Sequence, residues 1–390
     1  MDFFSILQLL GWAVVGIVII LFALTGGFDF GAGILLPFVG KTDEERRVVI
    51  NTVGPTWDGN QVWLITAGGA IFAIWPRVYA ASFSGLYFAF LLVLWALFLR
   101  PVSFEYRSKF VTQKWRNFWD WALFVGSFVP ALLLGVAVGN LFLGFPFQYD
   151  PITLRFFYGP SMQDANALIG LLGLLRPFAL LLGLFSLVMM LMHGAAYLCM
   201  RTEGTILARC QSMLKKSALV LIVLFAIAGI ALAWFVPGYH WTPISDPMNH
   251  PLSNLVAINT GGWLQNYRLY PWMALAPVLG FAGLAMVYLQ AARAHFGKAF
   301  IASIIAIFSV ISTVGLTLFP FIMPSLTHPE QSLLVWNASS SETSLLGILI
   351  VAVVMLPIIF WYTAFVYKKL WGRGVRMSVD DIRLQSKVLY

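Results

Sequence analysis

The sequence has few charged residues and few residues of the types that bind metals or form disulfide bonds. Charged residues make up only 10% of its 390 residues, and there are 2 cysteines and 5 histidines. Hydrophobic residues make up 60%, which leaves too little polar surface to cover a water-soluble globule. The composition therefore excludes an ordinary soluble domain and indicates a protein that lies in a lipid bilayer.

Motifs of several enzyme classes are also missing. The sequence contains no glycine-rich phosphate loop, no zinc-ligand spacing and no nucleophile elbow. Of the histidines, only His193, in "LMHGAAYL", falls within a long apolar run. A lone histidine in such a run is more often a hydrogen-bonded core residue than an axial metal ligand. On its own, the chain therefore shows little capacity for redox chemistry.

Long, continuous apolar runs indicate which kind of membrane protein this is. About 20 apolar residues cross the hydrocarbon core as a helix, whereas a membrane β-barrel shows alternating segments of about ten. The sequence thus predicts an all-α polytopic membrane protein, a single integral membrane domain of about nine transmembrane helices. The predicted spans are 8–36, 56–75, 78–100, 118–143, 166–199, 217–236, 270–292, 299–322 and 344–367. The first run follows "MDFF", which has no basic region, and contains Asp29, so we expect a span rather than a cleavable signal peptide.

Basic residues are distributed unevenly between the predicted loops. Lysines and arginines gather after the first, third, fifth, seventh and ninth spans. Four arginines lie on or towards the other side: Arg77, Arg155, Arg176 and Arg268. Because basic loops stay in the cytoplasm, we expect the N-terminus outside and the C-terminus inside. The net charge of +8 is therefore an orientation signal rather than a sign of nucleic-acid binding.

Two further features concern packing and redox state. Gly27 with Gly31, and Gly135 with Gly139, have the four-residue spacing that lets membrane helices approach closely. Cys199 and Cys210 fall at the cytoplasmic end of the fifth span, a reducing setting in which we expect no disulfide bond.

Ionisable residues occur near the cytoplasmic ends of the first four predicted spans. They are Asp29, Asp58, Arg100 and Asp120. A charge in the hydrocarbon region costs on the order of 2.5 to 3.5 kcal/mol on insertion scales, so such a residue is usually paired, solvated or functional. Asp29 lies between Phe28 and Phe30 and is too short to reach the interface. It therefore needs a partner, water or a proton.

The other three ionisable residues also have simpler interpretations. Asp58 and Asp120 could each cap the first turn of a helix and interact favourably with its dipole. Arg100, at a helix end, could extend its guanidinium group to the interface.

The polar start of the second span has a helical pattern of its own. At 3.6 residues per turn, Asp58, Gln61, Ile65 and Gly68 form one stripe, which we expect to point into the bundle. Trp63 lies more than a turn deeper than the interfacial tryptophans, where it could face lipid or a partner.

Five stretches of the sequence carry a resemblance to a known family. They are "GGFDFGAGILLPF", "ERRVVINTVGPTWDGNQVWLITAGGAIFAIWPRVYAASFSGLY", "LFLRPVSFEYRSK", "WRNFWDWALFVGSFVPALLLGVAVGN" and "FPFIMPS". Together they resemble subunit II of the bacterial cytochrome bd quinol oxidases. The similarity is densest over residues 22–145 and resumes near residues 317–326.

The resemblance implies an architecture and a set of partners. The fold would be two four-helix bundles plus a peripheral helix in the bacterial inner membrane. A neighbouring subunit I would hold haem b together with haem d, or only haem b, and would oxidise quinol. A small single-span subunit is often bound in this family. The complex would reduce oxygen and build a proton gradient without pumping, and this chain would ligate no haem or metal.

The resemblance also implies roles for particular residues. Asp58 in "TWDGNQ" matches the proton-entry carboxylate of the family, and Asp29 in "GFD" matches its partner. Gln61, Arg100 and Asp120 are further proton-pathway candidates. Trp63 in "NQVWL" matches the aromatic residue near a proposed oxygen entrance. Where many relatives carry an acidic residue before "GFD", this chain has Gly26.

Two other functions remain open from the residues alone. A secondary transporter would use Asp29 and Asp58 to bind a coupling cation near the bilayer midplane, usually beside inverted repeats. A purely structural membrane subunit would use both acids only as caps and packing partners.

Overall fold

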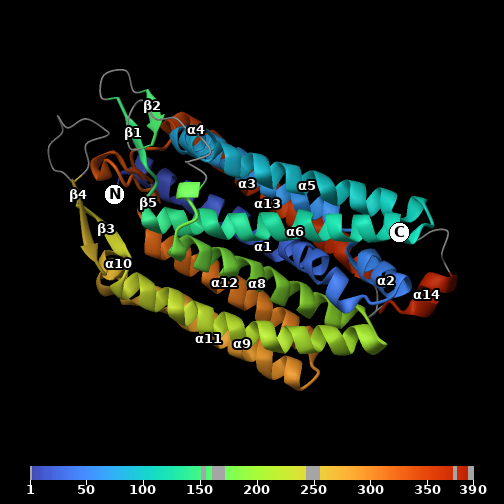
Figure 1. The fold of residues 1–390 in the computed structure, drawn as a ribbon. Helices are drawn as coiled ribbons and strands as arrows, with labels where there is room; N and C mark the ends of the chain where they lie inside the picture. Colours follow the sequence, from blue (N-terminus) through green and yellow to red (C-terminus); the bar gives the residue numbers. More distant parts are fainter. Residues whose placement is uncertain (1, 151–154, 160–171, 243–254, 372–375, 385–390) are drawn as a thin grey trace.

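The computed structural model describes residues 2–150, 155–159, 172–242, 255–371 and 376–384. Long helices run side by side along one direction, as Figure 1 shows. Short β-hairpins lie at one end of the molecule, here named the hairpin end, and α2 and α14 lie at the other, here named the α2 end. The chain is therefore all-α in its membrane part, as predicted.

The N-terminal half forms a first helix bundle. Its members are α1 (Phe3–Val39), α3 (Trp57–Ile74), α5 (Tyr87–Tyr106) and α6 (Gln113–Leu143). α1 packs against α3 and α6, and α5 packs against α6. Two shorter helices belong to the same half: α2 (Asp43–Val53) and α4 (Pro76–Gly85).

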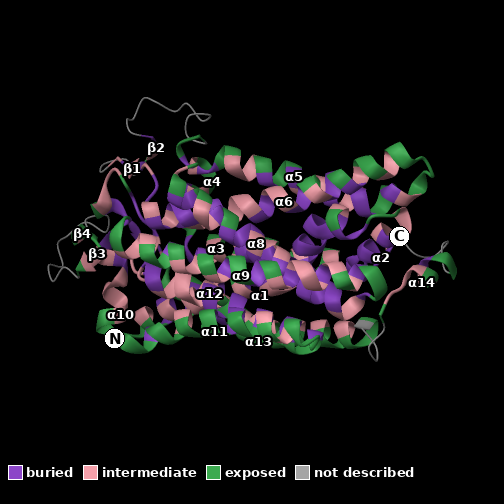
Figure 2. Ribbon diagram, turned by 60° about the horizontal axis from the view of Figure 1, so that its bottom comes forward, coloured by how far each residue is buried: buried purple, intermediate pink, exposed green. Residues whose placement is uncertain are grey.

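The C-terminal half forms a second bundle and a peripheral helix. The second bundle consists of α8 (Pro177–Arg201), α9 (Gly204–Trp234), α11 (Leu275–Ala292) and α12 (Phe296–Leu318). α8 joins the two bundles because it packs against both α1 and α6. α13 (Glu342–Trp371) lies outside both bundles, against α1 and α3, and most of its residues are exposed (Figure 2). This is the arrangement that the family resemblance implies.

The observed helices match most of the predicted spans, with exceptions. Among the described residues, eight helices are long and apolar enough to cross a membrane. The remaining predicted span, 56–75, matches α3, whose 18 residues rise about 27 Å. Asp58, Asn60 and Gln61 lower the mean hydropathy of α3, so it is not one of the eight. The predicted span 166–199 matches α8 from Pro177, while its residues 166–171 lie outside the described ones.

The predicted span 78–100 is not one continuous helix. α4 ends at Gly85 and α5 begins at Tyr87. A Cβ atom at Gly85 would lie 2.4 Å from the Tyr158 ring, so this ring packs directly on the backbone beside the break. The apolar pattern continues through the break, which is why the sequence alone did not show it.

Small residues allow the central helices to touch. A Cβ atom at Gly31 would lie 2.0 Å from the backbone oxygen of Met190 and 2.8 Å from Gly194. Gly135 and Gly139 face α8 at similarly short range. The predicted close packing is confirmed for these three positions, since only glycine fits there, whereas a Cβ atom at Gly27 would meet His193 at an ordinary 3.7 Å.

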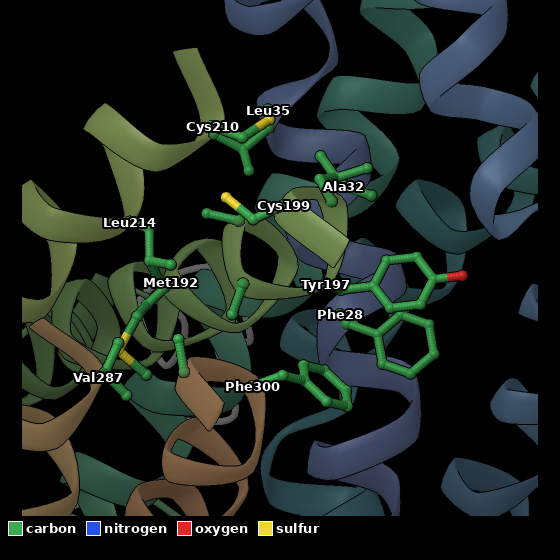
Figure 3. Close-up of a cluster of buried hydrophobic side chains, with 14 of the residues drawn as sticks. Phe28, Ala32, Leu35, Met192, Tyr197, Cys199, Cys210, Leu214, Val287 and Phe300 are labelled. Carbon is green, nitrogen blue, oxygen red and sulfur yellow. The ribbon is translucent and has the colours of Figure 1, made fainter. Parts of the chain in front are cut away.

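Aliphatic, aromatic and sulfur-containing side chains pack together in the largest core cluster (Figure 3). The rings of Phe28 and Tyr197 stack with centroids 4.3 Å apart, and Phe300 packs edge-on against Phe28. Cys199 and Cys210 are buried in the same cluster, and both are free.

Within the described ranges, three antiparallel hairpins lie at the hairpin end. They are β1 (Phe147–Tyr149) with β2 (Phe156–Tyr158), β3 (Pro237–Thr242) with β4 (Leu255–Thr260), and β5 (Phe321–Met323) with β6 (Leu333–Leu334). The short helices α10 (Gln265–Leu269) and α14 (Val379–Leu384) lie at opposite ends of the molecule.

Candidate functional site

Asp29 lies inside the first bundle, nearer to the α2 end. It is on α1 and is fully buried. Its Oδ2 atom accepts a hydrogen bond from Asn60 Nδ2 at 2.7 Å. Its Oδ1 atom has no hydrogen-bond partner among the residues that the structure describes. One carboxylate oxygen is thus fixed by protein, and the other can take a proton.

Asn60 connects Asp29 to the peripheral helix. Asn60 is buried on the inward face of α3, and its Oδ1 atom accepts a hydrogen bond from the Tyr367 hydroxyl of α13 at 2.5 Å. Asp29, Asn60 and Tyr367 therefore form one chain of hydrogen bonds across α1, α3 and α13.

Arg100 is close to the same carboxylate. The interpretation that it extends to the interface is wrong, because its exposed fraction is 1%. It donates from NH1 to Ser127 at 2.6 Å and stacks its guanidinium group on Phe30 at 4.3 Å. Its charge interacts with Asp29 through space. Its Nε and NH2 atoms have no partner in the described part of the chain. Buried donors of this kind usually bond to ordered water.

Only half of the stripe predicted to point into the bundle faces outward, since Gln61 and Gly68 are half-buried. Asp58 is exposed in the first turn of α3, and Ile65 is 74% exposed. The inward face of α3 is formed by its buried residues, which are Asn60, Trp63, Ala67 and Ile74. Asn60 takes the inward position because it bonds to both Asp29 and Tyr367. Both faces begin with polar residues, so periodicity alone could not choose between them.

Gln61 extends its side-chain amide towards α1 near Asp29. Its Nε2 atom is buried and has no hydrogen-bond partner within the described ranges. It lies 3.8 Å from the position that a Cβ atom would occupy at Gly26, one helical turn from Asp29. Gln61 therefore brings a polar side chain from the exposed start of α3 towards Asp29.

Asp120 belongs to a separate network at the α2 end. It is 1% exposed, and Arg107 donates to it at 2.5 Å and 3.1 Å while Arg46 donates at 2.9 Å. Asp43 binds the same Arg107 at 2.9 Å and Arg116 at 2.5 Å. The interpretation of Asp120 as a helix cap is wrong, because the first turn of α6 contains no acidic residue. This network ties α2 to the ends of α5 and α6.

Glu45 forms a second ion pair between α2 and another helix. It completes a capping box with Thr42 and accepts a hydrogen bond from Arg209 of α9 at 2.7 Å. Burial acts to raise the pKa of Glu45, but the hydrogen bonds from Arg209, from the Lys41 backbone and from Thr205 outweigh it and hold the pKa at about 2. Glu45 is thus a structural anion.

His193 has both ring nitrogens engaged within this chain. Nδ1 lies 2.8 Å from the Ser303 hydroxyl, and Nε2 lies 2.9 Å from the backbone oxygen of Leu24. The ring is fully buried and stacks on Phe300 at 4.9 Å. A haem iron would need one of these nitrogens, so the residues around His193 do not fit haem ligation. Among the described residues, no group of three or more metal-binding side chains occurs either.

Trp63 is buried inside this chain and does not face lipid. Its exposed fraction is 5%, and it packs in a cluster with Phe22 and Phe30. Its ring lies 6.2 Å from that of Phe360 on α13.

Sequence reasoning missed two residues of this site. Asn60 stands beside Asp58 and Gln61 in the sequence but was not assigned a role. Tyr367 lies far away in the chain, at the end of the ninth predicted span, where an aromatic residue is expected at the interface in any case. No sequence signal joins it to Asp29.

The long apolar helices and the buried polar residues define the class of protein. The chain is a multi-pass α-helical membrane protein that buries hydrogen-bonded and ion-paired charges inside its first bundle. Within that class, it belongs to the family of cytochrome bd terminal oxidase subunit II, whose model matches residues 7–370.

Individual relatives agree with this assignment. The chain is 43% identical over 392 residues to cytochrome bd-I ubiquinol oxidase subunit 2 of Escherichia coli (strain K12). This match covers 99% of each of the two chains. It is 30% identical over 364 residues to cytochrome bd ubiquinol oxidase subunit 2 of Bacillus subtilis (strain 168), over 92% of this chain and 95% of the relative. In fold it is similar to a chain of the bd oxidase from Geobacillus thermodenitrificans, with a TM-score of 0.63, 12% identity, and coverage of 93% of this chain and 98% of that one.

Proposed function

We propose that this chain is the second subunit of a quinol oxidase complex and that its Asp29 helps to carry protons towards the oxygen-reducing site. The observation that carries the proposal is the setting of Asp29. It is fully buried, with one oxygen bonded to Asn60 and the other without a partner in the described structure. A carboxylate held only for structure would have both oxygens engaged, as Asp120 has.

The proposed proton route starts at the α2 end. Asp58 is exposed there, and Gln61, three residues later, lies near Gly26 of α1, one helical turn from Asp29. Basic residues gather at this end, so we propose that it faces the cytoplasm and that the N-terminus lies outside the inner membrane. Reduction of oxygen in the membrane separates charge only if its protons come from the cytoplasmic side. Asp58 would be the entry and Asp29 the buried relay.

The haem groups belong to the neighbouring subunit I in this proposal. The names of the relatives specify ubiquinol oxidases, and the environment of His193 does not fit an axial ligand. Haem b together with haem d, or only haem b, would supply the electron transfer from quinol to oxygen. This chain would stabilise subunit I without ligating haem, and the complex would be electrogenic without pumping. A small single-span subunit completes the assembly we propose.

Two alternative functions receive less support. The match to subunit II relatives over nearly the whole chain does not favour a cation-coupled transporter. A purely structural role suits Asp120, which is held by two arginines, better than it suits Asp29. An oxygen route past Trp63 is a separate proposal, which the KM for oxygen of a Trp63→Ala complex would test.

The experiment is an Asp29→Asn substitution in the assembled complex. Asparagine keeps the size of the side chain and a hydrogen bond to Asn60 but cannot exchange a proton. We expect the haem absorption spectrum to stay unchanged and quinol oxidase turnover to fall at least about tenfold. Asp380→Asn, at an 83% exposed side chain of the same end, is the matched control and should retain turnover. Full turnover in the Asp29→Asn complex would overturn the proposal.

A further inference from the structure

The hydrogen-bond chain to Asp29 begins on the peripheral helix. Tyr367 donates to Asn60 Oδ1 at 2.5 Å, and Asn60 donates from Nδ2 to Asp29 Oδ2 at 2.7 Å. All three side chains come from different helices, so the chain is made only when α13 is seated against α1 and α3. Tyr367 also packs edge-on near Phe28, with ring centroids 6.5 Å apart.

The amide group in the middle has two ends with opposite properties. Its oxygen can only accept hydrogen bonds, and its nitrogen can only donate them. With the nitrogen towards Asp29, the amide stabilises the ionised carboxylate, and the tyrosine hydroxyl must donate to the amide oxygen. With the amide rotated, its oxygen accepts from a protonated Asp29, and its nitrogen donates to the tyrosine oxygen. A hydroxyl is both donor and acceptor, so Tyr367 suits both arrangements.

We propose that Tyr367 is a positioning residue for proton transfer, which holds the Asn60 amide against Asp29 in both protonation states of the carboxyl group. This inference rests on the proposed relay role of Asp29. It assigns to the peripheral helix a part in the chemistry of the first bundle. A phenylalanine at position 367 would leave one end of the buried amide without a partner in either arrangement, and the amide would no longer be held in place.

The test is a Tyr367→Phe substitution in the complete complex. Phenylalanine keeps the ring against Phe28 and removes only the hydroxyl group. We expect the haem spectrum and the KM for quinol to be unchanged and turnover to fall about fivefold, the order expected for the loss of one buried hydrogen bond. Tyr362→Phe is the matched control, since Tyr362 lies on the same helix and is 61% exposed. It should leave turnover unchanged.

A double-substitution cycle separates positioning from simple anchoring of α13. If Tyr367 acts through Asn60, the Tyr367→Phe/Asn60→Leu complex should turn over no more slowly than the Asn60→Leu complex alone. Additive losses in the double variant, parental turnover in Tyr367→Phe, or a Tyr367→Phe complex that fails to assemble would each overturn the inference.

An infrared difference spectrum distinguishes failure of the inference about Tyr367 from failure of the proposed relay role of Asp29. A carboxyl C=O band that disappears in the Asp29→Asn complex reports protonation of Asp29 during turnover. We expect this band to move in Tyr367→Phe as its hydrogen bonding changes. If the band is present but does not move, only the role of Tyr367 is refuted. If no band depends on Asp29, the proposed relay is refuted, and the role of Tyr367 falls with it.

Discussion

The Asp120→Asn substitution should destabilise the subunit without stopping its function. Asp120 is 1% exposed and binds Arg107, whose side chain is 2% exposed, through two hydrogen bonds. Asparagine removes the negative charge and leaves Arg107 buried with less compensation. Breaking a buried ion pair costs about 3 to 5 kcal/mol. Asp43 still binds Arg107 at 2.9 Å, so we expect the lower end, a loss of about 3 kcal/mol.

The assay compares stability and turnover in the same preparation. The unfolding midpoint of the purified complex should fall in Asp120→Asn, while turnover per haem of the complexes that remain assembled should stay within about twofold, since Asp120 is assigned no catalytic role. Asp380→Asn, at the exposed pair with Arg383, should change neither quantity. Asp29→Asn should give the opposite pattern, with lost turnover and retained stability. A stable Asp120→Asn complex with no turnover would refute the structural interpretation of this network.

Two further substitutions test the α2 end of the molecule. Because the pKa of Glu45 lies at about 2, below its ordinary value of 4.5, the stability it contributes is complete above pH 4.5 and is lost as the pH falls towards 2. From pH 5 to pH 3, the thermal unfolding midpoint of the parent complex should therefore fall more than that of a Glu45→Gln complex. Equal falls in the two midpoints would contradict this. Asp58→Ala should lower the rate of proton uptake and turnover several-fold while the complex assembles normally, because Asp58 is exposed in the first turn of α3. An unchanged rate of proton uptake in the Asp58→Ala complex would show that Asp58 is not on the route and that protons reach Asp29 by another path.

The membrane architecture could be predicted from the sequence because its causes are local. Apolar runs of about 20 residues can be recognised from a short stretch of sequence without knowledge of the packing. The interruption between α4 and α5 could not be predicted, because the apolar pattern continues through it and the Tyr158 ring that packs on Gly85 lies far along the chain. The close approach at Gly31 was predicted from spacing, but its partner Gly194 was not.

The candidate site could be predicted only in part. The cost of burying a charge identified Asp29 as a residue that needs a partner, and Asn60 is that partner. Arg100 was expected to reach the interface, but the structure buries it. The same reasoning could not assign Asp120 to an ion-pair network, because its partners Arg46 and Arg107 lie on segments whose packing the sequence does not specify. The helical phase of α3 depends on Asn60, whose partners come from α1 and α13.

The most direct measurement is proton uptake by complexes reconstituted in vesicles with the α2 end outward, followed with a pH indicator after the reduced complex meets oxygen. The parent complex should take up protons from the outer solution together with oxygen reduction. In the Asp29→Asn complex, electron transfer should begin while proton uptake slows at least about tenfold. Uptake at the parental rate in that complex, or uptake from the solution facing the hairpin end, would contradict the assignment of Asp29 as the buried proton relay.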